Sequence, residues 1–425
     1  MNIRPRLIIS AAIVLALAIG VFARSREDLA RDAVSADEAP RAEAIAALRA
    51  EGSAGLEALF TAYNPEITAF LKSGEASERW NRIAFAIDSV AMQKDGYASH
   101  LFWFTDLDAA IAEAKLTGKP VLSLRMLGNL NEEYSCANSR FFRAILYSNS
   151  EIADYLRENY VLHWKSVRPV PKVTIDFGDG RKMERTLTGN SIHYILSDRG
   201  EVIDALPGLY GPESFLSSLR NARTFGRDVL VGASDNQRYP AIATYQAGIA
   251  RAMRSKRDAA IRESGVKIGP EADPKSTKAV EISTIAVTKM VTEAPILRDL
   301  DDNFSRFEAQ IDTETWKKVA AKYAGETTLD RSTLDFIRRQ NRNSSGIAFE
   351  RMIANLRTLV AIDSTRNDLI LRPQIYTRLN RAARPALEAF NAEIYRDLFK
   401  TPDSDRWLGL YSDDVYTGLD GNGIR

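Results

Sequence analysis

The amino-acid sequence predicts an α/β domain with a central mixed sheet, followed by a mainly α-helical C-terminal domain. Between residues 101 and 222, short apolar runs bounded by Gly and Pro alternate with amphipathic segments, as strands alternate with helices in α/β domains. After residue 222, apolar positions recur at helical spacing almost to the end of the chain. The change in periodicity places the boundary between the two domains.

The composition fits a folded protein of more than one domain and argues against several classes of function. The chain has 425 residues, of which 45% are hydrophobic and 27% charged, and a single core rarely organises so long a chain. Because its formal net charge is only +1, we expect no nucleic-acid partner. One cysteine and three histidines leave no intramolecular disulfide framework and argue against a dedicated metal site. We predict no cofactor.

Residues 1–23 are typical of a targeting segment. Arg4 and Arg6 precede an uncharged apolar run of about 17 residues, Leu7 to Ala23. Such a run is long for the core of a signal peptide and barely long enough to span a bilayer. A cleaved signal peptide and an N-terminal anchor with membrane attachment through residues 7–23 both stay open. Either would place the chain in a periplasmic or extracytoplasmic compartment, as a secreted or an anchored protein.

Residues 24–100 are expected to form a helical lead-in to the α/β domain. The segment is rich in Ala, Glu and Arg, and apolar residues recur at helical spacing in 43–50 and 56–60. Gly52 to Gly55 separate these two stretches, so we predict a helical hairpin broken at the glycines.

Local signals set the expected elements of the α/β domain, residues 101–222. Asp106 is a good N-cap for a helix that ends at Thr117, before Gly118. Further helices are expected to begin at Cys136, Ser150 and Pro212. The expected strands are 121–127, 161–167, 173–177, 182–187, 191–196 and 201–206.

A hairpin turn is predicted at Gly178-Asp179-Gly180, because these residues tolerate a positive φ. Asp176, Asp179 and Arg181 surround this turn. Asp and Gly are ordinary turn residues, so we assign them no cation site.

The order of these elements resembles the thioredoxin fold, with residues 169–188 as a β-hairpin insertion. Thr105-Asp-Leu-Asp-Ala-Ala and Thr117-Gly-Lys-Pro-Val-Leu look like the lead-in of bacterial thioredoxin-like domains, and residues 189–206 look like their last two strands. The resemblance covers about 120 of the 425 residues. It implies a thioredoxin-like domain fused to a helical one.

The active-site motif of that family is half present. Family enzymes carry Cys-x-x-Cys at the start of the helix, whereas this chain has Cys136-Ala-Asn-Ser139, a CxxS-type motif without the second thiol. Ser191 stands where the family usually has a cis-proline, and Tyr134-Ser135 where Trp is common. These differences weaken the transfer of the family's usual activity.

Cys136, Ser139 and Arg140 are the candidate catalytic residues. A thiol at a helix N-terminus faces unpaired N–H groups and the positive end of the helix dipole, and both stabilise the thiolate. Arg140 lies one helical turn on and would add positive potential, and Ser139 can donate a hydrogen bond to a thiolate. Without a second cysteine, exchange needs an external thiol, or it leaves a client protein bound as a mixed disulfide.

His193 offers a further alternative. A Cys136/His193 pair could bind a soft metal such as Cu(I), or act as nucleophile and base. Strand alternation puts His193 on one face with Ser191 and Ile195. On that face it either reaches the site or packs beneath a helix. His163 is assigned no chemistry.

Residues 223–400 are expected to form a helical domain, and residues 401–425 a tail with Trp407, Tyr411 and Tyr416 that packs over a neighbouring domain. The expected helices are 241–263, 277–291, 300–311, 315–323, 329–340, 347–359 and 373–399.

Two functions stay open from the sequence alone. The first is an exported thioredoxin-like protein that carries out monothiol disulfide exchange or redox handling of client proteins through Cys136. The second is a non-catalytic protein-binding scaffold on a degenerate thioredoxin fold, which binds its partners through surfaces such as the helical domain.

Overall fold

The computed structural model describes residues 24–186, 189–264, 318–320, 327–381, 386–399, 401, 404 and 406. The targeting segment expected at 1–23, the helices expected at 277–291 and 300–311, and most of the tail expected at 401–425 lie outside these residues. Of the helix expected at 315–323, only residues 318–320 are described, and they are helical. No helix within the described ranges has both the length and the apolar character that a membrane span requires.

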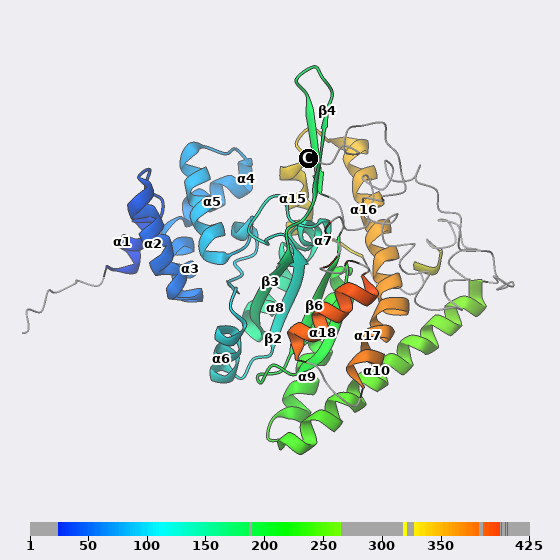
Figure 1. The fold of residues 1–425 in the computed structure, drawn as a ribbon. Coiled ribbons are helices and arrows are strands. Elements are labelled where there is room, and N and C mark those ends of the chain that lie inside the picture. The colour runs from blue at the N-terminus through cyan, green and yellow to red at the C-terminus, as the bar shows by residue number, and fades with distance from the viewer. Residues whose placement is uncertain are drawn as a thin grey trace, which may run out of the picture.

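The N-terminal helices form a unit with its own apolar core (Figure 1). Buried residues along these helices, Leu48, Leu59 and Ile87 among them, make a cluster distinct from that of the sheet. The helices are α1 (Arg26–Asp32), α2 (Glu38–Ala50), α3 (Ser53–Ala62), α4 (Asn64–Ser73), α5 (Glu78–Ala91) and the 3-10 turn η1 (Gly96–Ala98). The helical lead-in is confirmed.

A glycine inside α3 lets two helices of this unit pack closely. Gly52, with a φ of 69°, lies in the short break between α2 and α3. Gly55, which the sequence placed in the break, is instead part of α3, and a Cβ there would lie 1.9 Å from the carbonyl oxygen of Leu48. The predicted helical hairpin is therefore confirmed with a shorter break, because Gly55 is needed for the helix contact rather than for the turn.

A five-stranded mixed sheet lies at the centre of the molecule. Its strand order is β1-β3-β2-β6-β7. β1 and β2 run parallel to β3, β6 runs antiparallel to β2, and β7 runs antiparallel to β6. The strands are β1 (Trp103–Phe104), β2 (Val121–Leu127), β3 (Val161–Arg168), β6 (Ser191–Leu196) and β7 (Val202–Pro207). The predicted mixed sheet is confirmed, and β1 is an addition that two residues are too few to signal.

Local capping explains why the elements around the sheet begin and end where the sequence predicted. The Asp106 carboxylate accepts a hydrogen bond from the Ala109 N–H at 2.7 Å and starts α6 (Leu107–Thr117). Gly118, with a φ of 68°, ends it. α8 (Ser150–Asn159) likewise begins behind Asn149, which caps it with its side chain.

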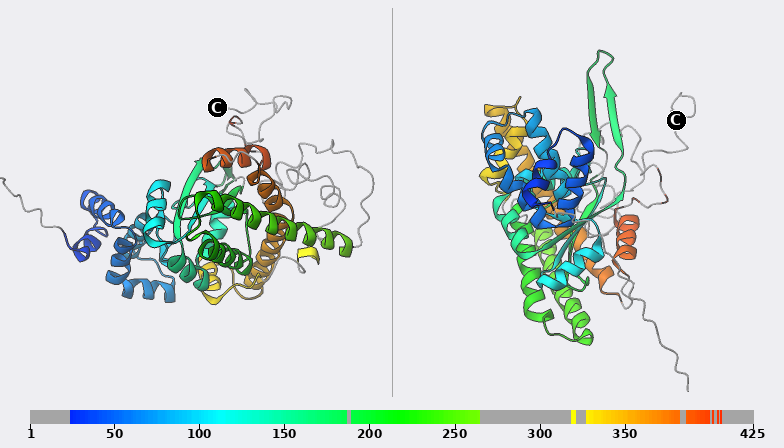
Figure 2. Two further views of the ribbon diagram at one scale, coloured as in Figure 1. Left: turned by 90° about the horizontal axis from the view of Figure 1, so that it is seen from below. Right: turned by 90° about the vertical axis from the view of Figure 1, so that its left-hand side faces the viewer.

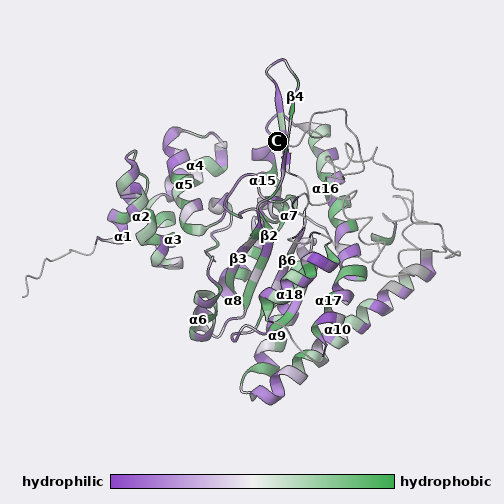
Figure 3. Ribbon diagram, viewed as in Figure 1, coloured by the Kyte–Doolittle hydropathy of each residue, from purple (hydrophilic) through white to green (hydrophobic). Residues whose placement is uncertain are grey.

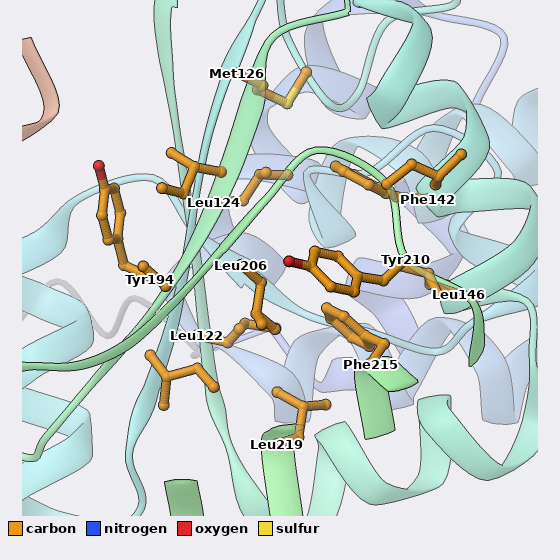
Figure 4. Packing of buried hydrophobic residues seen from close by; sticks show 14 of the residues in the cluster. Leu122, Leu124, Met126, Phe142, Leu146, Tyr194, Leu206, Tyr210, Phe215 and Leu219 are labelled. Atoms are coloured by element: carbon orange, nitrogen blue, oxygen red, sulfur yellow. The ribbon is translucent and has the colours of Figure 1, made fainter. Parts of the chain in front are cut away.

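Helices cover both faces of the sheet. On one face, Leu122, Leu124 and Leu206 pack against α9 (Pro212–Phe225) and the π-helical turn η2 (Phe142–Tyr147), as Figure 4 shows. On the other face, Tyr194 contacts Phe390 of α18. Figure 3 shows the hydrophobic residues that follow the central strands.

The segment between β3 and β6 forms a separate two-stranded sheet, β4 (Lys172–Asp176) and β5 (Lys182–Thr186). Gly178 and Gly180, with φ of 77° and 90°, form its turn as predicted. This hairpin projects away from the body of the molecule (Figures 1 and 2).

The C-terminal region is helical, as predicted, and shares one core with the sheet. A single buried cluster contains Leu124 of the sheet together with Ile375 and Phe390 of the C-terminal helices. The elements are η3 (Gly226–Leu230), α10 (Asp235–Ser264), α15 (Arg331–Gln340), α16 (Gly346–Arg366), η5 (Asn367–Leu371), α17 (Arg372–Leu379), α18 (Leu387–Glu393) and η6 (Ile394–Leu398).

Several helix boundaries in this region were predicted wrongly: α10 begins before the expected residue 241, and α16 continues past the expected residue 359. The single helix expected at 373–399 is instead α17, followed after a break by α18 and η6. α17 ends at Asn380, and Pro385 in the sequence disfavours a helical conformation at the residue before it.

Buried arginines fasten the C-terminal helices to the sheet. Arg372 of α17 contacts the Asp204 carboxylate of β7 at 2.6 Å, and both side chains are almost fully buried. The Tyr376 hydroxyl donates a hydrogen bond to the same carboxylate. On the opposite face, Arg125 of β2 donates to Glu388 of α18 at 2.8 Å.

Candidate functional site

Cys136 is the N-cap residue of α7 (Ala137–Phe141), a short helix that continues directly into η2. Its backbone N–H donates to the Leu127 carbonyl at the end of β2, at 3.1 Å. The predicted position at a helix start, directly after the loop that follows β2, is therefore confirmed. Its side chain is 0% exposed, so the thiol lies inside the apolar core.

Ser139 lies within reach of the thiol, but its hydroxyl proton is engaged elsewhere. Ser139 Oγ donates to the Cys136 carbonyl at 2.8 Å. It accepts from the Cys136 thiol at 3.5 Å. In this arrangement the serine binds the neutral thiol, and stabilising a thiolate would require its hydroxyl to turn.

Arg140 lies near Cys136 and points toward the hairpin. Its Nη2 donates to the hydroxyl of Thr186, the last residue of β5, at 2.8 Å. Burial lowers the pKa of Arg140, and the nearby Cys136 acts in the opposite direction. The arginine therefore links the Cys136 helix to the base of the hairpin.

Two buried tyrosines from different parts of the chain interact electrostatically with Cys136. Burial raises the pKa of Tyr147 in η2 and of Tyr395 in η6 well above the usual range, and Cys136 adds to both shifts through its charge. The Tyr395 hydroxyl donates to the Asn190 carbonyl at 3.3 Å. Tyrosines of η2 and η6 therefore lie in the buried surroundings of Cys136.

The residues around the motif are joined by further polar contacts. Asn138 donates from its side chain to the Ser191 hydroxyl at 2.8 Å. Ser191 is the position where the family that the sequence resembles usually has a cis-proline, and no peptide bond among the described residues is cis. The motif helix and the start of β6 are therefore held together by a hydrogen bond.

His193 packs beneath helices, which was one of the two alternatives left open by the sequence. Its ring lies 4.6 Å from that of Phe142 and 5.2 Å from that of Phe215, measured between centroids. Its Nε2 is 2.7 Å from the Tyr147 hydroxyl, and burial lowers its pKa to about 3. A neutral His193 accepts a hydrogen bond from the Tyr147 hydroxyl through Nε2, so this nitrogen is already engaged.

The described residues contain no group of three or more His, Cys, Asp or Glu side chains that could hold a metal ion. A soft-metal site on Cys136 and His193 alone would have to compete with the Ser139 and Tyr147 contacts that these side chains already make.

A second buried polar group lies on the opposite face of the sheet and was missed by sequence reasoning. Arg125 is 0% exposed and donates to Ser123 Oγ at 2.6 Å. His163 Nδ1 lies 2.8 Å from the same hydroxyl, and burial, together with Arg125, lowers the pKa of His163 to about 3. The signal in the sequence was an arginine within an otherwise apolar strand. Its role here is to hold α18 through Glu388.

Two clefts among the described residues lie elsewhere. A cleft of about 300 Å³ lies between the N-terminal helices and the sheet domain and is lined by residues that include Glu57, His100 and Phe102. A cleft of about 740 Å³ lies between α4 and α15–α16 and is lined by residues that include Arg338, Arg339 and Asp335. Cys136 lines neither of them.

Comparison of the chain with models of known protein families, with curated proteins and with solved structures finds no match. The candidate function therefore rests on the geometry of this chain.

Proposed function

We propose that this chain is a non-catalytic protein-binding module built on a thioredoxin-like domain. The fold part of the proposal is supported by the strand order β1-β3-β2-β6-β7, in which β6 alone runs antiparallel to the other four strands. It is also supported by a helix that begins at a cysteine after β2. The sequence resemblance pointed to the same arrangement.

The complete burial of Cys136 carries the functional part of the proposal. Thiol–disulfide exchange requires an incoming sulfur to reach the thiolate, so exchange depends on access. Cys136 is 0% exposed and donates to Ser139, and the chain has no other cysteine. A buried free cysteine of this kind acts as a small hydrophobic residue.

Burial also fits the export that the sequence predicts for the chain. An oxidising compartment would drive an exposed lone thiol to pair with other thiols. A fully buried thiol is protected from such pairing, and this protection lets a single cysteine persist without a catalytic role.

Monothiol exchange through Cys136, Ser139 and Arg140 is the competing function. The position of Cys136 at a helix start favours it. It would require the packing around Cys136 to open, because the thiol is 0% exposed.

Reaction of the folded protein with an aromatic disulfide reagent separates the two functions. Attack of a thiol on this reagent releases a coloured aromatic thiol. We expect this reaction of Cys136 to be slow in buffer and fast in urea, because only unfolding gives access to the sulfur. A Cys136→Ser protein provides the zero-signal control. Fast and stoichiometric release from the folded protein would establish a reactive thiol and overturn the proposal.

A further inference from the structure

The two faces of the β4–β5 hairpin differ in chemistry. Directly opposed residues share a face, and successive residues along each strand alternate between faces. One face carries the polar pairs, which are Lys172 with Thr186, Thr174 with Glu184 and Asp176 with Lys182. The other face carries Val173 with Arg185, Ile175 with Met183 and, one step beyond the strand, Phe177.

The polar face is satisfied by contacts of its own. Thr174 donates to Glu184 at 3.4 Å, and Lys182 pairs with Asp176 at 3.3 Å. At its base, Arg140 of the Cys136 helix donates to Thr186. These polar side chains are therefore paired within the protein itself.

The apolar face is open to solvent. Ile175 is 44% exposed, Phe177 51% and Met183 39%, and none of the three belongs to either buried cluster of the described residues. Contiguous exposed apolar side chains mark interaction sites in soluble proteins. Figure 2 shows that the hairpin projects clear of the helices that could have covered this face.

The hairpin also offers free backbone edges. Because the sheet has only two strands, β4 and β5 each have one edge with unpaired N–H and C=O groups, which can pair with another extended chain. A two-stranded sheet is only marginally stable on its own, and a third strand with a hydrophobic face stabilises it.

The arginine beside the apolar face indicates what kind of segment would bind there. Arg185 opposes Val173 on this face, and its only polar contact among the described residues is with the Glu184 carbonyl. The Arg181 guanidinium lies 5.4 Å from the centroid of the Phe177 ring and pairs with Asp179. An apolar surface bordered by an arginine without a carboxylate partner complements an acidic segment.

We propose that the hairpin binds an extended segment of a partner protein as a third strand. Apolar side chains at alternate positions of that segment cover Ile175, Phe177 and Met183, and a carboxylate on it pairs with Arg185. This inference rests on the proposed protein-binding function, and it names the docking element and the class of segment that docks.

Photo-crosslinking at neighbouring positions on opposite faces tests the inference. A photoreactive residue replaces Ile175 on the apolar face or Thr174 on the polar face of the full chain in its own cells, and the crosslinked segment is sequenced. We expect more adducts from position 175 than from position 174, because the apolar anchors of the segment lie on the face of Ile175. We expect the sequenced segment to alternate apolar residues with others and to carry acidic residues.

A synthetic peptide of that segment then measures the affinity by fluorescence anisotropy. We expect Ile175→Ser with Met183→Ser to weaken binding by about tenfold or more, since buried apolar anchors dominate such interfaces. We expect Arg185→Glu to weaken it as well, and Thr174→Ala to leave it unchanged. All these residues lie on the projecting hairpin, so equal thermal unfolding of the variants shows that folding is intact.

Equal crosslinking from both positions, or no adduct from position 175, would overturn the inference. A crosslink to a second copy or to another part of this chain would overturn it as well. So would a peptide whose affinity is unchanged by the apolar substitutions. A reactive Cys136 would overturn the proposed function and leave these binding results unchanged, so the two failures are distinguishable.

Discussion

The Cys136 helix and the β4–β5 hairpin are joined by the Arg140–Thr186 hydrogen bond, yet they expose opposite kinds of side chain. Cys136 and His193, the types with reactive chemistry, are 0% exposed. Ile175 and Phe177 of the hairpin, apolar types that normally form a core, are 44% and 51% exposed. In this chain, therefore, the side chains with reactive chemistry are packed in the core, whereas the apolar side chains of the hairpin are exposed and available for binding.

The largest expected effect comes from a buried charge in the enclosed region, compared with an exposed one in the hairpin. Asp204→Ala leaves Arg372 buried without its carboxylate, and we expect the free energy of unfolding to fall by about 3–5 kcal/mol. Asp176→Ala removes an exposed ion pair with Lys182, and we expect a loss of about 0–1 kcal/mol. Urea unfolding measures both.

A double substitution, Asp204→Leu with Arg372→Met, serves as the control for that comparison. It removes both buried charges, so we expect it to recover much of the stability that Asp204→Ala loses. Equal losses for Asp204→Ala and Asp176→Ala would contradict the contrast between the two regions.

The next effect is a pH dependence that belongs to the enclosed region. The pKa values of His193 and His163 are lowered to about 3 by burial, so below pH 6 the unfolded chain takes up protons that the native state does not. Each histidine is therefore expected to lower the free energy of unfolding by about 1.4 kcal/mol per pH unit between pH 6 and 4. Unfolding of the wild type and of His193→Leu across this range measures the slope, and equal slopes would contradict the prediction.

One group in the N-terminal unit acts in the opposite direction. Burial raises the pKa of Asp88 to about 6, so the stability that Asp88 contributes is present below about pH 4 and is lost as the pH rises to about 6. Asp88→Asn is therefore expected to steepen the net loss of stability on acidification. Comparison of its unfolding at pH 7 and pH 4 with that of the wild type checks the sign.

A smaller expected loss of stability distinguishes a structural role of Ser139 from a catalytic role. Ser139→Ala removes the hydroxyl that accepts from Cys136 and donates to its carbonyl, and we expect a loss of about 1–2 kcal/mol in the free energy of unfolding. The native reactivity of Cys136 should stay slow, because the thiol remains enclosed. A large change in thiol reactivity without a change in stability would favour the catalytic role.

The smallest expected effect is in the hairpin. Phe177→Ser removes an exposed ring from a projecting turn, and we expect the free energy of unfolding to change by about 0.5 kcal/mol or less. Phe142→Ala, at a buried ring of the enclosed region, should cost about 3–5 kcal/mol. Thermal unfolding compares the two, and a large loss for Phe177→Ser would show that the described body of the protein covers this face.

Features set by local chemistry were predicted well from the sequence. The Asp106 cap, the buried strand 121–127, the helix start at Cys136 and the turn at Gly178 to Gly180 all depend on residues close together in the chain. The strand β1 was missed because its two residues carry no periodic signal.

Long-range contacts could not be predicted in the same way. Tyr395, whose pKa Cys136 helps to raise, lies more than 250 residues further along the chain, and no local pattern predicts such an interaction. The same reason applies to Arg125, whose partner Glu388 lies in α18. Whether the candidate residues were accessible therefore became known only with the structure, although the sequence had located them.

The most direct test compares the alkylation rate of Cys136 in the wild type with that of a cysteine placed in the hairpin, Phe177→Cys in a Cys136→Ser background. We expect the hairpin thiol to react as an exposed thiol does, and Cys136 to react at least about 100-fold more slowly until urea unfolds the protein. Comparable rates for the two thiols in the folded protein would contradict the enclosed, non-catalytic Cys136 on which the account depends.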